Sequence, residues 1–335
     1  LFAVLKTDKK EILPVDFYPY FYLYTDSPLT DAEKAKLNSR QIESSQSISK
    51  LTFNTVEELV KTRNELLDTD FFIGKSYRLY EYDIPFVLRF FLDKGLTSYC
   101  NVSYILENGR VKDITKLDTE KPKPKYCTFD IEVLVSKSLA FPTPGSEPII
   151  SISYMGSDKE TAVFFLSGDN VNLAEKQEEL EGKFQTISLF KTERELIAGF
   201  MEFIKQKSPD VVYSYNGIFD FDYLKKAYKA LTGEEFTFGD YRLVTPKSKT
   251  KRVNLEGALH IDVYAIMKLL RYLQVFNYPK LDLNTLYSRL TGKRKLSLPP
   301  KEMREAYLSG DYSKIIEYNL DDVSATQELA DNYSP

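Results

Sequence analysis

Thr128-Phe129-Asp130-Ile131-Glu132-Val133 (TFDIEV) places two carboxylates in a stretch that otherwise has the composition of a β-strand, predicted over 125–134. Charged residues are disfavoured in strands, and residues at i and i+2 of a strand point to the same face of the sheet. Asp130 and Glu132 are therefore expected side by side, where burial and mutual repulsion both oppose two negative charges. A bound cation would remove that cost. The alternative is that this face is simply exposed to water.

A second carboxylate stands in Tyr215–Leu224 (YNGIFDFDYL). The apolar strand predicted over 210–215 ends at Asn216-Gly217, and a helix is predicted over 219–231. Asp220 then lies in the first turn of that helix, where the end of a strand meets the start of a helix and α/β sheets build their sites. The alternative is that Asp220 only caps the helix and compensates its dipole.

The third candidate is Glu317–Val323 (EYNLDDV), within a long final helix predicted over 312–332. Tyr318 and Asp322 are four residues apart, so they lie one above the other on one face of the helix. A tyrosine hydroxyl beside a carboxylate can hold a water molecule. An exposed Tyr–Asp pair on an amphipathic helix is the alternative.

Composition limits the kind of metal site. The chain has two cysteines, Cys100 and Cys127, and one histidine, His260. Disulfide frameworks, zinc clusters and histidine-based triads are therefore disfavoured. Any metal would have to be held by oxygen atoms, which favours hard cations such as Mg²⁺ or Mn²⁺. His260 is expected to be structural.

Net charge and hydropathy constrain the function less than the cysteine and histidine counts do. The formal charge is −4, from 45 basic and 49 acidic residues, which is not the basic balance typical of nucleic-acid-binding domains. A sum near neutrality can nevertheless conceal a basic groove beside an acidic site. No apolar run is long enough for a transmembrane helix, and no signal peptide is recognisable. The chain does not begin with Met, so we expect a fragment.

The segment 120–125 (EKPKPK) predicts an exposed connector, because alternating proline suits neither a helix nor a central strand. We therefore predict domains at 1–124 and 125–335. The first mixes strands and helices as a small α+β domain. The second combines strands with helices, including a capped helix over 192–207, which predicts a mixed sheet with helices on its faces. The connection 236–259 is long; it is expected to be either functional or a solvated charge run, and carries Lys247, Lys249, Lys251 and Arg252.

The order and spacing of the three carboxylate segments resemble the three exonuclease motifs of the proofreading domain in family B DNA polymerases. Phe129–Glu132 is similar to the first motif, Tyr215–Leu224 to the second and Tyr318–Thr326 to the third. Segments 17–22 and 80–96 resemble the N-terminal domain of the archaeal members. The resemblance covers nearly the whole chain. It implies an α/β fold: a ribonuclease H-like (DnaQ-like) exonuclease domain with a mixed sheet and flanking helices, after a small α+β domain.

The resemblance also implies a mechanism, which is 3′–5′ hydrolysis of DNA with two divalent cations, Mg²⁺ or Mn²⁺. Four carboxylates and a tyrosine would carry it: Asp130, Glu132, Asp220 and Asp322 as metal ligands, with Tyr318 orienting water. The second motif is one residue shorter than in many archaeal relatives between Asn216 and Phe219. Counting back from Tyr223-Leu224 assigns Asp220 as the ligand, with Asp222 as the fallback.

DNA is the partner that the resemblance implies, as a single-stranded 3′ end or a primer–template. The candidate DNA contacts are Asn216, Phe219, Lys247, Lys249, Lys251 and Arg252. A candidate pocket for deaminated template bases comprises Pro19, Tyr20, Ile84, Phe86 and Arg89, which are otherwise core residues and a solvated arginine.

The palm, fingers and thumb of a polymerase are missing from these 335 residues. The sliding clamp is a further candidate partner, no membrane partner is expected, and the expected location is the nucleoid-containing cytoplasm of a prokaryote. The competing interpretations are a non-catalytic DNA-binding or scaffolding subunit and an RNA-processing exonuclease.

Overall fold

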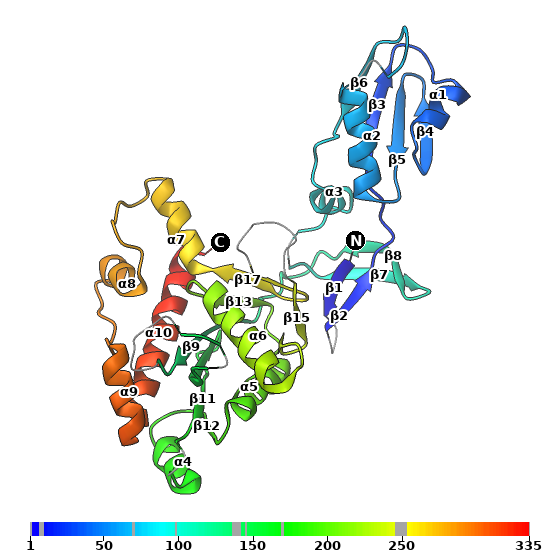
Figure 1. Ribbon diagram of the computed structural model, residues 1–335. Helices are drawn as coiled ribbons and strands as arrows, with labels where there is room; N and C mark the ends of the chain where they lie inside the picture. Colours follow the sequence, from blue (N-terminus) through cyan, green and yellow to red (C-terminus); the bar gives the residue numbers. More distant parts are fainter. Residues whose placement is uncertain are drawn as a thin grey trace. The chain divides into compact units, whose positions relative to one another are not determined.

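The computed structural model describes residues 2–6, 10–68, 71–97, 99–135, 142–144, 146–168, 171–244 and 253–334. The chain divides into two compact units, Leu1–Lys123 and Pro124–Pro335 (Figure 1). Throughout the described ranges, no helix combines the length and the apolar character needed to cross a membrane.

The first unit is an α+β structure around an antiparallel sheet with the strand order β4-β5-β3-β6. Phe21 and Leu23 of β3 (Tyr20–Thr25) are buried with Leu59 and Leu66 of α2 (Val56–Asp68), so this helix packs on the sheet. The hairpins β1-β2 and β7-β8 are antiparallel. The other elements are β1 (Phe2–Lys6), β2 (Lys10–Pro14), α1 (Asp31–Lys36), β4 (Gln41–Ser45), β5 (Ile48–Thr52), β6 (Tyr77–Tyr80), α3 (Phe86–Asp93), β7 (Val102–Glu107) and β8 (Arg110–Lys116).

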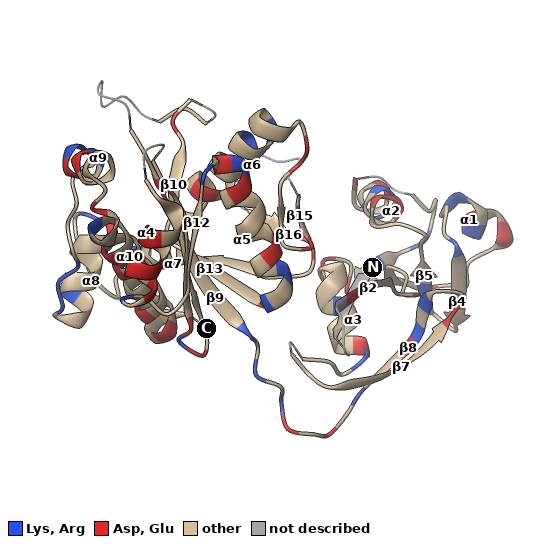
Figure 2. Ribbon diagram, turned by 90° about the horizontal axis from the view of Figure 1, so that it is seen from below, with Lys and Arg blue, Asp and Glu red and all other residues tan. Residues whose placement is uncertain are grey.

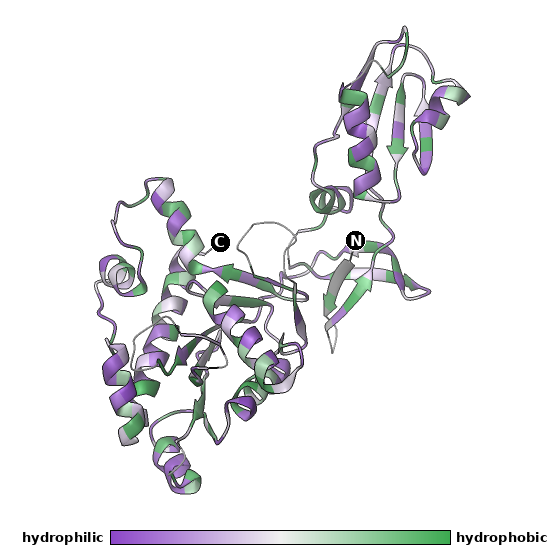
Figure 3. Ribbon diagram, viewed as in Figure 1, coloured by the Kyte–Doolittle hydropathy of each residue, from purple (hydrophilic) through white to green (hydrophobic). Residues whose placement is uncertain are grey.

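The second unit contains a mixed sheet with the strand order β12-β11-β10-β9-β13-β17. The β9–β10 and β10–β11 pairs are antiparallel. The β11–β12, β9–β13 and β13–β17 pairs are parallel. The strands of the sheet are β9 (Tyr126–Val133), β10 (Ile149–Gly156), β11 (Thr161–Leu166), β12 (Ile187–Phe190), β13 (Val211–Ser214) and β17 (Leu259–Asp262). Figure 3 shows how apolar the middle of this sheet is.

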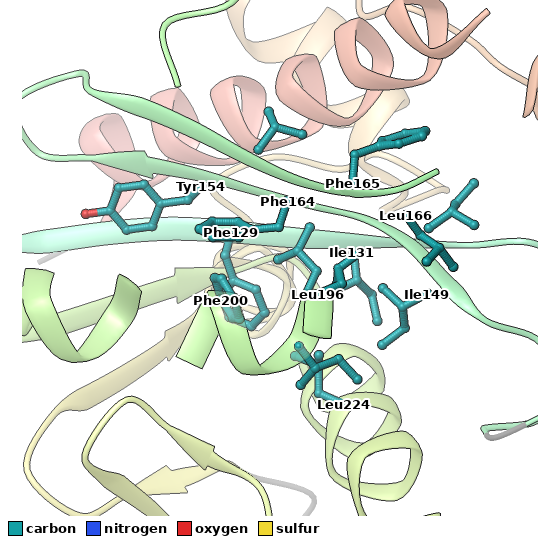
Figure 4. Close-up of a cluster of buried hydrophobic side chains, with 14 of the residues drawn as sticks. Phe129, Ile131, Ile149, Tyr154, Phe164, Phe165, Leu166, Leu196, Phe200 and Leu224 are labelled. Carbon is teal, nitrogen blue, oxygen red and sulfur yellow. The ribbon is translucent and has the colours of Figure 1, made fainter. Parts of the chain in front are cut away.

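Helices cover both faces of the sheet. The remaining elements are α4 (Leu173–Glu181), α5 (Glu193–Lys207), α6 (Ile218–Thr232), β14 (Thr237–Phe238), β15 (Tyr241–Val244), β16 (Asn254–Leu255), α7 (Val263–Tyr272), α8 (Leu283–Thr291), α9 (Pro300–Ser309) and α10 (Tyr312–Tyr333). The ring of Phe129 on β9 packs against Phe200 of α5 and Phe221 of α6, at centroid distances of 5.7 and 5.0 Å. Phe165 of β11 instead contacts Tyr312 of α10, at 4.7 Å. Figure 4 shows members of this core, including Phe129 and Phe200 on the α5–α6 side of the sheet and Phe165, which packs towards α10.

The alternation along β9 positions the candidate site. Phe129 and Ile131 enter the apolar core on the α5–α6 side. Because side chains of a strand alternate between faces, Asp130 and Glu132 turn to the opposite face, which α10 covers. On the neighbouring strand β10, Ser153 pairs with Asp130 and Ser151 pairs with Glu132.

The predicted mixed sheet with flanking helices is confirmed, as is the capping box of α5, in which Thr192 and Glu195 exchange backbone-to-side-chain hydrogen bonds of 3.2 Å. The long connection 236–259 contains the short strands β14, β15 and β16, which the sequence patterns did not predict. These pieces are two to four residues long, too short for a periodic signal. Lys247, Lys249, Lys251 and Arg252 lie outside the described residues.

Candidate metal centre

Three carboxylates meet where β9 faces α10. One oxygen from each of Asp130, Glu132 and Asp322 can be chosen so that all lie within 4.8 Å of one another. Asp322 is buried, whereas Asp130 and Glu132 keep some accessible surface although protein atoms surround their carboxylates. Figure 2 marks in red the acidic residues of α10 and of α6, the helices on opposite faces of the sheet. An all-oxygen donor set of this kind suits a hard divalent cation.

The electrostatics of this group favour a cation. Desolvation raises the pKa of Asp130 well above its ordinary value, and the neighbouring carboxylates of Asp220, Asp322 and Glu132 raise it further. Desolvation and then the Asp322 carboxylate likewise raise the pKa of Glu132. The pKa of Asp322 is also raised by burial, against the lowering effects of Lys295 and Tyr318. The raised pKa values show that negative charge is unfavourable at these three carboxylates, and a bound cation would compensate it.

Asp220 reaches the site from the corner between β13 and α6. Asn216 adopts a left-handed conformation (φ 60°), and Gly217 lies so close to Ser214 that a Cβ atom there would come within 1.9 Å of the Ser214 hydroxyl oxygen. Only glycine fits this tight turn, which starts α6 directly after the strand. Asp220, the third residue of α6, is 4% exposed.

Asp220 is linked to the three-carboxylate group by charge, although it is not a member of it. Burial raises its pKa to about 8, against backbone hydrogen bonds from Asp220 itself and Ile131. The fallback candidate Asp222 is in a different environment: its side chain is 53% exposed and forms an ion pair of 2.6 Å with Lys226. The structure thus places Asp220, and not Asp222, beside the group.

Tyr318 and Asp322 lie one turn apart on α10, and their side chains interact. Burial, and then the charge of Asp322, raises the pKa of Tyr318. Its hydroxyl therefore stays protonated and able to donate a hydrogen bond.

Lys295, on the segment between α8 and α9, is a member of the site that the sequence patterns did not reveal. Its ammonium forms an ion pair with Asp322 and lies 4.0 Å from the centre of the Tyr318 ring, and its side chain is only 3% exposed. The positive charge of Lys295 lowers the pKa of Asp130, Glu132 and Asp322. Its place in the run Lys293-Arg294-Lys295 resembles an ordinary solvated surface, so the sequence offered no signal for it.

Asn319 is the second member of the site that sequence reasoning missed. Its amide nitrogen donates a 2.9 Å hydrogen bond to Oδ2 of Asp130, and its amide oxygen accepts a 2.8 Å hydrogen bond from the Ser151 hydroxyl. A signal was available here, because Asn319 precedes Asp322 by three residues and so shares its face of the helix.

The other sequence candidates are dispersed. Asn216 is exposed, and its backbone N–H donates to Asp262, whereas Phe219 is half-buried with its ring 5.5 Å from that of Tyr223. His260 is structural in character: it hydrogen-bonds Ser214 at 2.8 Å, and burial lowers its pKa to about 4, which keeps it neutral.

The candidate pocket residues lie in the first unit. Pro19 and Tyr20 are buried, Ile84 and Phe86 are partly buried, and Phe86 stacks on Phe17 at 5.5 Å. Arg89 is 5% exposed and donates hydrogen bonds to the Glu81 side chain and to the Tyr20 hydroxyl. Binding of template bases by these residues stays a prediction.

The model of one protein family, described as "DNA polymerase family B, exonuclease domain", matches residues 77–285, more than half of the chain. The chain is 27% identical to a DNA polymerase of Thermococcus sp. (strain 9oN-7) and 28% identical to one of Thermococcus kodakarensis. These alignments cover 95% of this chain but only 38% and 18% of the two polymerases. The solved structure of the family B DNA polymerase from Pyrobaculum calidifontis has a similar fold over 99% of this chain and 43% of that one, with a TM-score of 0.68 and 22% identity.

Proposed function

Because this chain belongs to DNA polymerase family B through its exonuclease domain, we propose that it is a 3′–5′ exonuclease that removes nucleotides from the 3′ end of DNA with two divalent cations, Mg²⁺ or Mn²⁺. The observation that carries the proposal is the convergence of Asp130, Glu132 and Asp322, with Asp220 beside them, in a setting where burial opposes negative charge.

In the proposed mechanism, Asp130, Glu132, Asp220 and Asp322 hold the cations. When bound, divalent cations polarise the phosphoryl oxygens and lower the pKa of water so that it can attack phosphorus. The bond between phosphorus and the 3′ oxygen then breaks, which releases a mononucleotide and leaves a new 3′ hydroxyl.

Tyr318 is proposed to orient the attacking water, since its hydroxyl stays protonated beside Asp322. Lys295 is proposed to offset part of the negative charge, because its buried ammonium already pairs with Asp322. Neither role requires histidine, in keeping with a neutral His260 bonded to Ser214.

For substrate binding we propose that Asn216 and Phe219 contact the terminal nucleotide, since both stand at the start of the helix that carries Asp220. Lys247, Lys249, Lys251 and Arg252 are proposed to contact phosphates of paired DNA. The pocket at Pro19, Tyr20, Ile84, Phe86 and Arg89 is proposed to contact template bases. The polymerising palm, fingers and thumb, and a sliding clamp, are the proposed protein partners in a prokaryotic cytoplasm.

The direct test is cleavage of a single-stranded DNA oligonucleotide labelled at its 5′ end. We expect a ladder of products shortened from the 3′ end in Mg²⁺ or Mn²⁺, and no products in excess chelator. A matched oligonucleotide of RNA and one with a blocked 3′ end should be cut much more slowly. Binding of DNA without cleavage in either metal would favour a non-catalytic subunit, and faster cleavage of RNA would favour an RNA-processing enzyme.

A further inference from the structure

We propose that Asn319 is a positioning residue for Asp130, and that a hydrogen-bond chain from Ser151 through Asn319 holds this carboxylate ready for a divalent cation. This inference rests on the proposed function of the carboxylate group as a metal centre. It assigns a role to two buried polar residues that the exonuclease mechanism above does not use.

The chain of hydrogen bonds crosses from the sheet to the helix and back. Ser151 on β10 donates to Oδ1 of Asn319 on α10 at 2.8 Å, and Nδ2 of Asn319 donates to Oδ2 of Asp130 on β9 at 2.9 Å. Ser151 and Asn319 are both 0% exposed. Because water cannot replace either partner at these positions, loss of one group leaves the other unsatisfied.

The chemistry of the groups sets the orientation of the amide. The carboxylate of Asp130 is ionised when a cation is bound, and an ionised carboxylate only accepts hydrogen bonds, so in that state the NH₂ side of Asn319 must face Asp130, as it does here. The amide oxygen must then face Ser151, whose hydroxyl is able to donate. Ser151 thereby satisfies the amide oxygen and anchors the Asn319 side chain, and Asn319 in turn holds one oxygen of Asp130.

Asp130 needs such support because its neighbours repel it. Asp220, Asp322 and Glu132 all act on it with like charge. Lys295, the cation of the site, forms its ion pair with Asp322. Asn319 supplies a neutral donor to Asp130 itself. Groups that orient metal ligands by hydrogen bonds typically contribute about 10- to 100-fold to metal affinity.

The same helix provides a matched control. Gln327 lies eight residues after Asn319 on α10, is also 0% exposed and donates its amide to the backbone oxygen of Gly156 at 3.4 Å. Its replacement removes a buried amide from α10 without removing a contact to a carboxylate of the site. General loosening of the helix should therefore appear in both variants, whereas loss of positioning should appear only at Asn319.

The experiment compares the full chain with Asn319→Leu, Ser151→Ala and Gln327→Leu by calorimetric titration with Mn²⁺, supported by cleavage rates over a range of Mn²⁺ concentrations. We expect Asn319→Leu to weaken Mn²⁺ binding about 10- to 100-fold, and Ser151→Ala to weaken it by a smaller factor. Gln327→Leu should bind Mn²⁺ as the unmodified chain does. Cleavage by Asn319→Leu should recover towards the unmodified rate as Mn²⁺ is raised.

Equal Mn²⁺ affinities for Asn319→Leu and the unmodified chain would overturn the positioning role, as would equal losses in Asn319→Leu and Gln327→Leu. If Asn319→Leu does not fold, Ser151→Ala decides, and an unchanged affinity in that variant overturns the proposal. Absence of Mn²⁺ binding by the unmodified chain would overturn the proposed function and this inference with it. Normal binding by the unmodified chain and by all variants would overturn this inference alone.

Discussion

Each unit of the chain contains a cluster of charged groups with at least one buried member, and the two clusters differ in their balance of charge. In the first unit, Arg89 is matched by the Glu81 side chain and backbone oxygen, while the Tyr20 hydroxyl bonds to Asp93 at 2.7 Å. In the second unit, Asp130, Glu132, Asp220 and Asp322 are grouped. Among the described residues, Lys295 is the cation with a marked effect on the pKa values of Asp130, Glu132 and Asp322.

The balance of charge determines how each cluster is stabilised. A buried charge whose partners are already present is stabilised within the fold before any ligand binds. A buried excess of one charge is unstable unless protons or counter-ions join it. The first cluster is therefore expected to respond to mutation through stability, and the second through metal and pH.

The largest effect is expected from Asp130→Ala combined with Glu132→Ala. Cleavage of single-stranded DNA should fall by at least about 10³-fold, because metal-ion stabilisation of the transition state is worth several kcal/mol and each 1.4 kcal/mol is tenfold in rate. The measurement is the cleavage rate, with circular dichroism as the control for folding. A folded double variant that cleaves at the normal rate would refute the site assignment.

The stability of the metal-free chain should depend on pH through its raised carboxyl pKa values. A folded-state pKa above the unfolded value stabilises the fold at low pH, and this contribution is lost as pH rises through the folded pKa. For Asp220, stability should therefore fall between about pH 4, near the pKa of an unfolded aspartate, and about pH 8, the folded-state pKa. The slope should be at most about 1.4 kcal/mol per pH unit for each such group.

Urea unfolding in chelator between pH 5 and pH 8 checks this expectation. Asp220→Asn should lose less stability over that range than the unmodified chain, so the difference between the two should change with pH. A difference that is constant with pH would show that Asp220 does not titrate as expected.

Arg89→Leu tests the charge cluster of the first unit, in which Arg89 is paired with Glu81. The fold of the first unit should lose about 1–3 kcal/mol, the usual cost of leaving buried hydrogen-bonding groups unsatisfied. The Glu81 side chain is 48% exposed and can turn to water, so the effect should stay within this range. Cleavage of a free single strand should be unchanged. Urea unfolding and the cleavage rate measure the two quantities, and a large loss of single-strand cleavage would contradict the assignment.

The smallest effect is expected from replacing Lys247, Lys249, Lys251 and Arg252 by Gln. Binding to a primer–template should become less dependent on salt, because each lost phosphate contact removes about 0.9 from the slope of log affinity against log salt. Binding to free single strands should change less. Equal salt slopes before and after replacement would identify these residues as an ordinary solvated charge run.

Periodicity predicted the parts of the site that regular elements carry. The two-residue period of β9 places Asp130 and Glu132 together, and the helical period of α10 places Tyr318 beside Asp322. The Asn216-Gly217 turn likewise predicts the start of the helix that carries Asp220. These features follow from local geometry, which the sequence specifies directly.

The remaining features depend on contacts between distant segments. Lys295 enters the site from an irregular segment between α8 and α9, where no period applies. The sequence suggests a solvated charge or a pocket residue at Arg89, yet Arg89 is 5% exposed and donates hydrogen bonds to Glu81, whose backbone is left-handed (φ 56°). Neither position could be inferred without knowing how the chain folds back on itself.

We propose that the carboxylate cluster of Asp130, Glu132, Asp220 and Asp322 binds a divalent cation and that the cluster around Arg89 does not. Calorimetric titration of Mn²⁺ into the metal-free chain tests it most directly, alongside Asp130→Asn with Glu132→Gln and alongside Arg89→Leu. We expect the unmodified chain to bind Mn²⁺ saturably, the double variant to lose this binding, and Arg89→Leu to retain it. Binding that survives in the double variant, or no binding by the unmodified chain, would contradict this proposal.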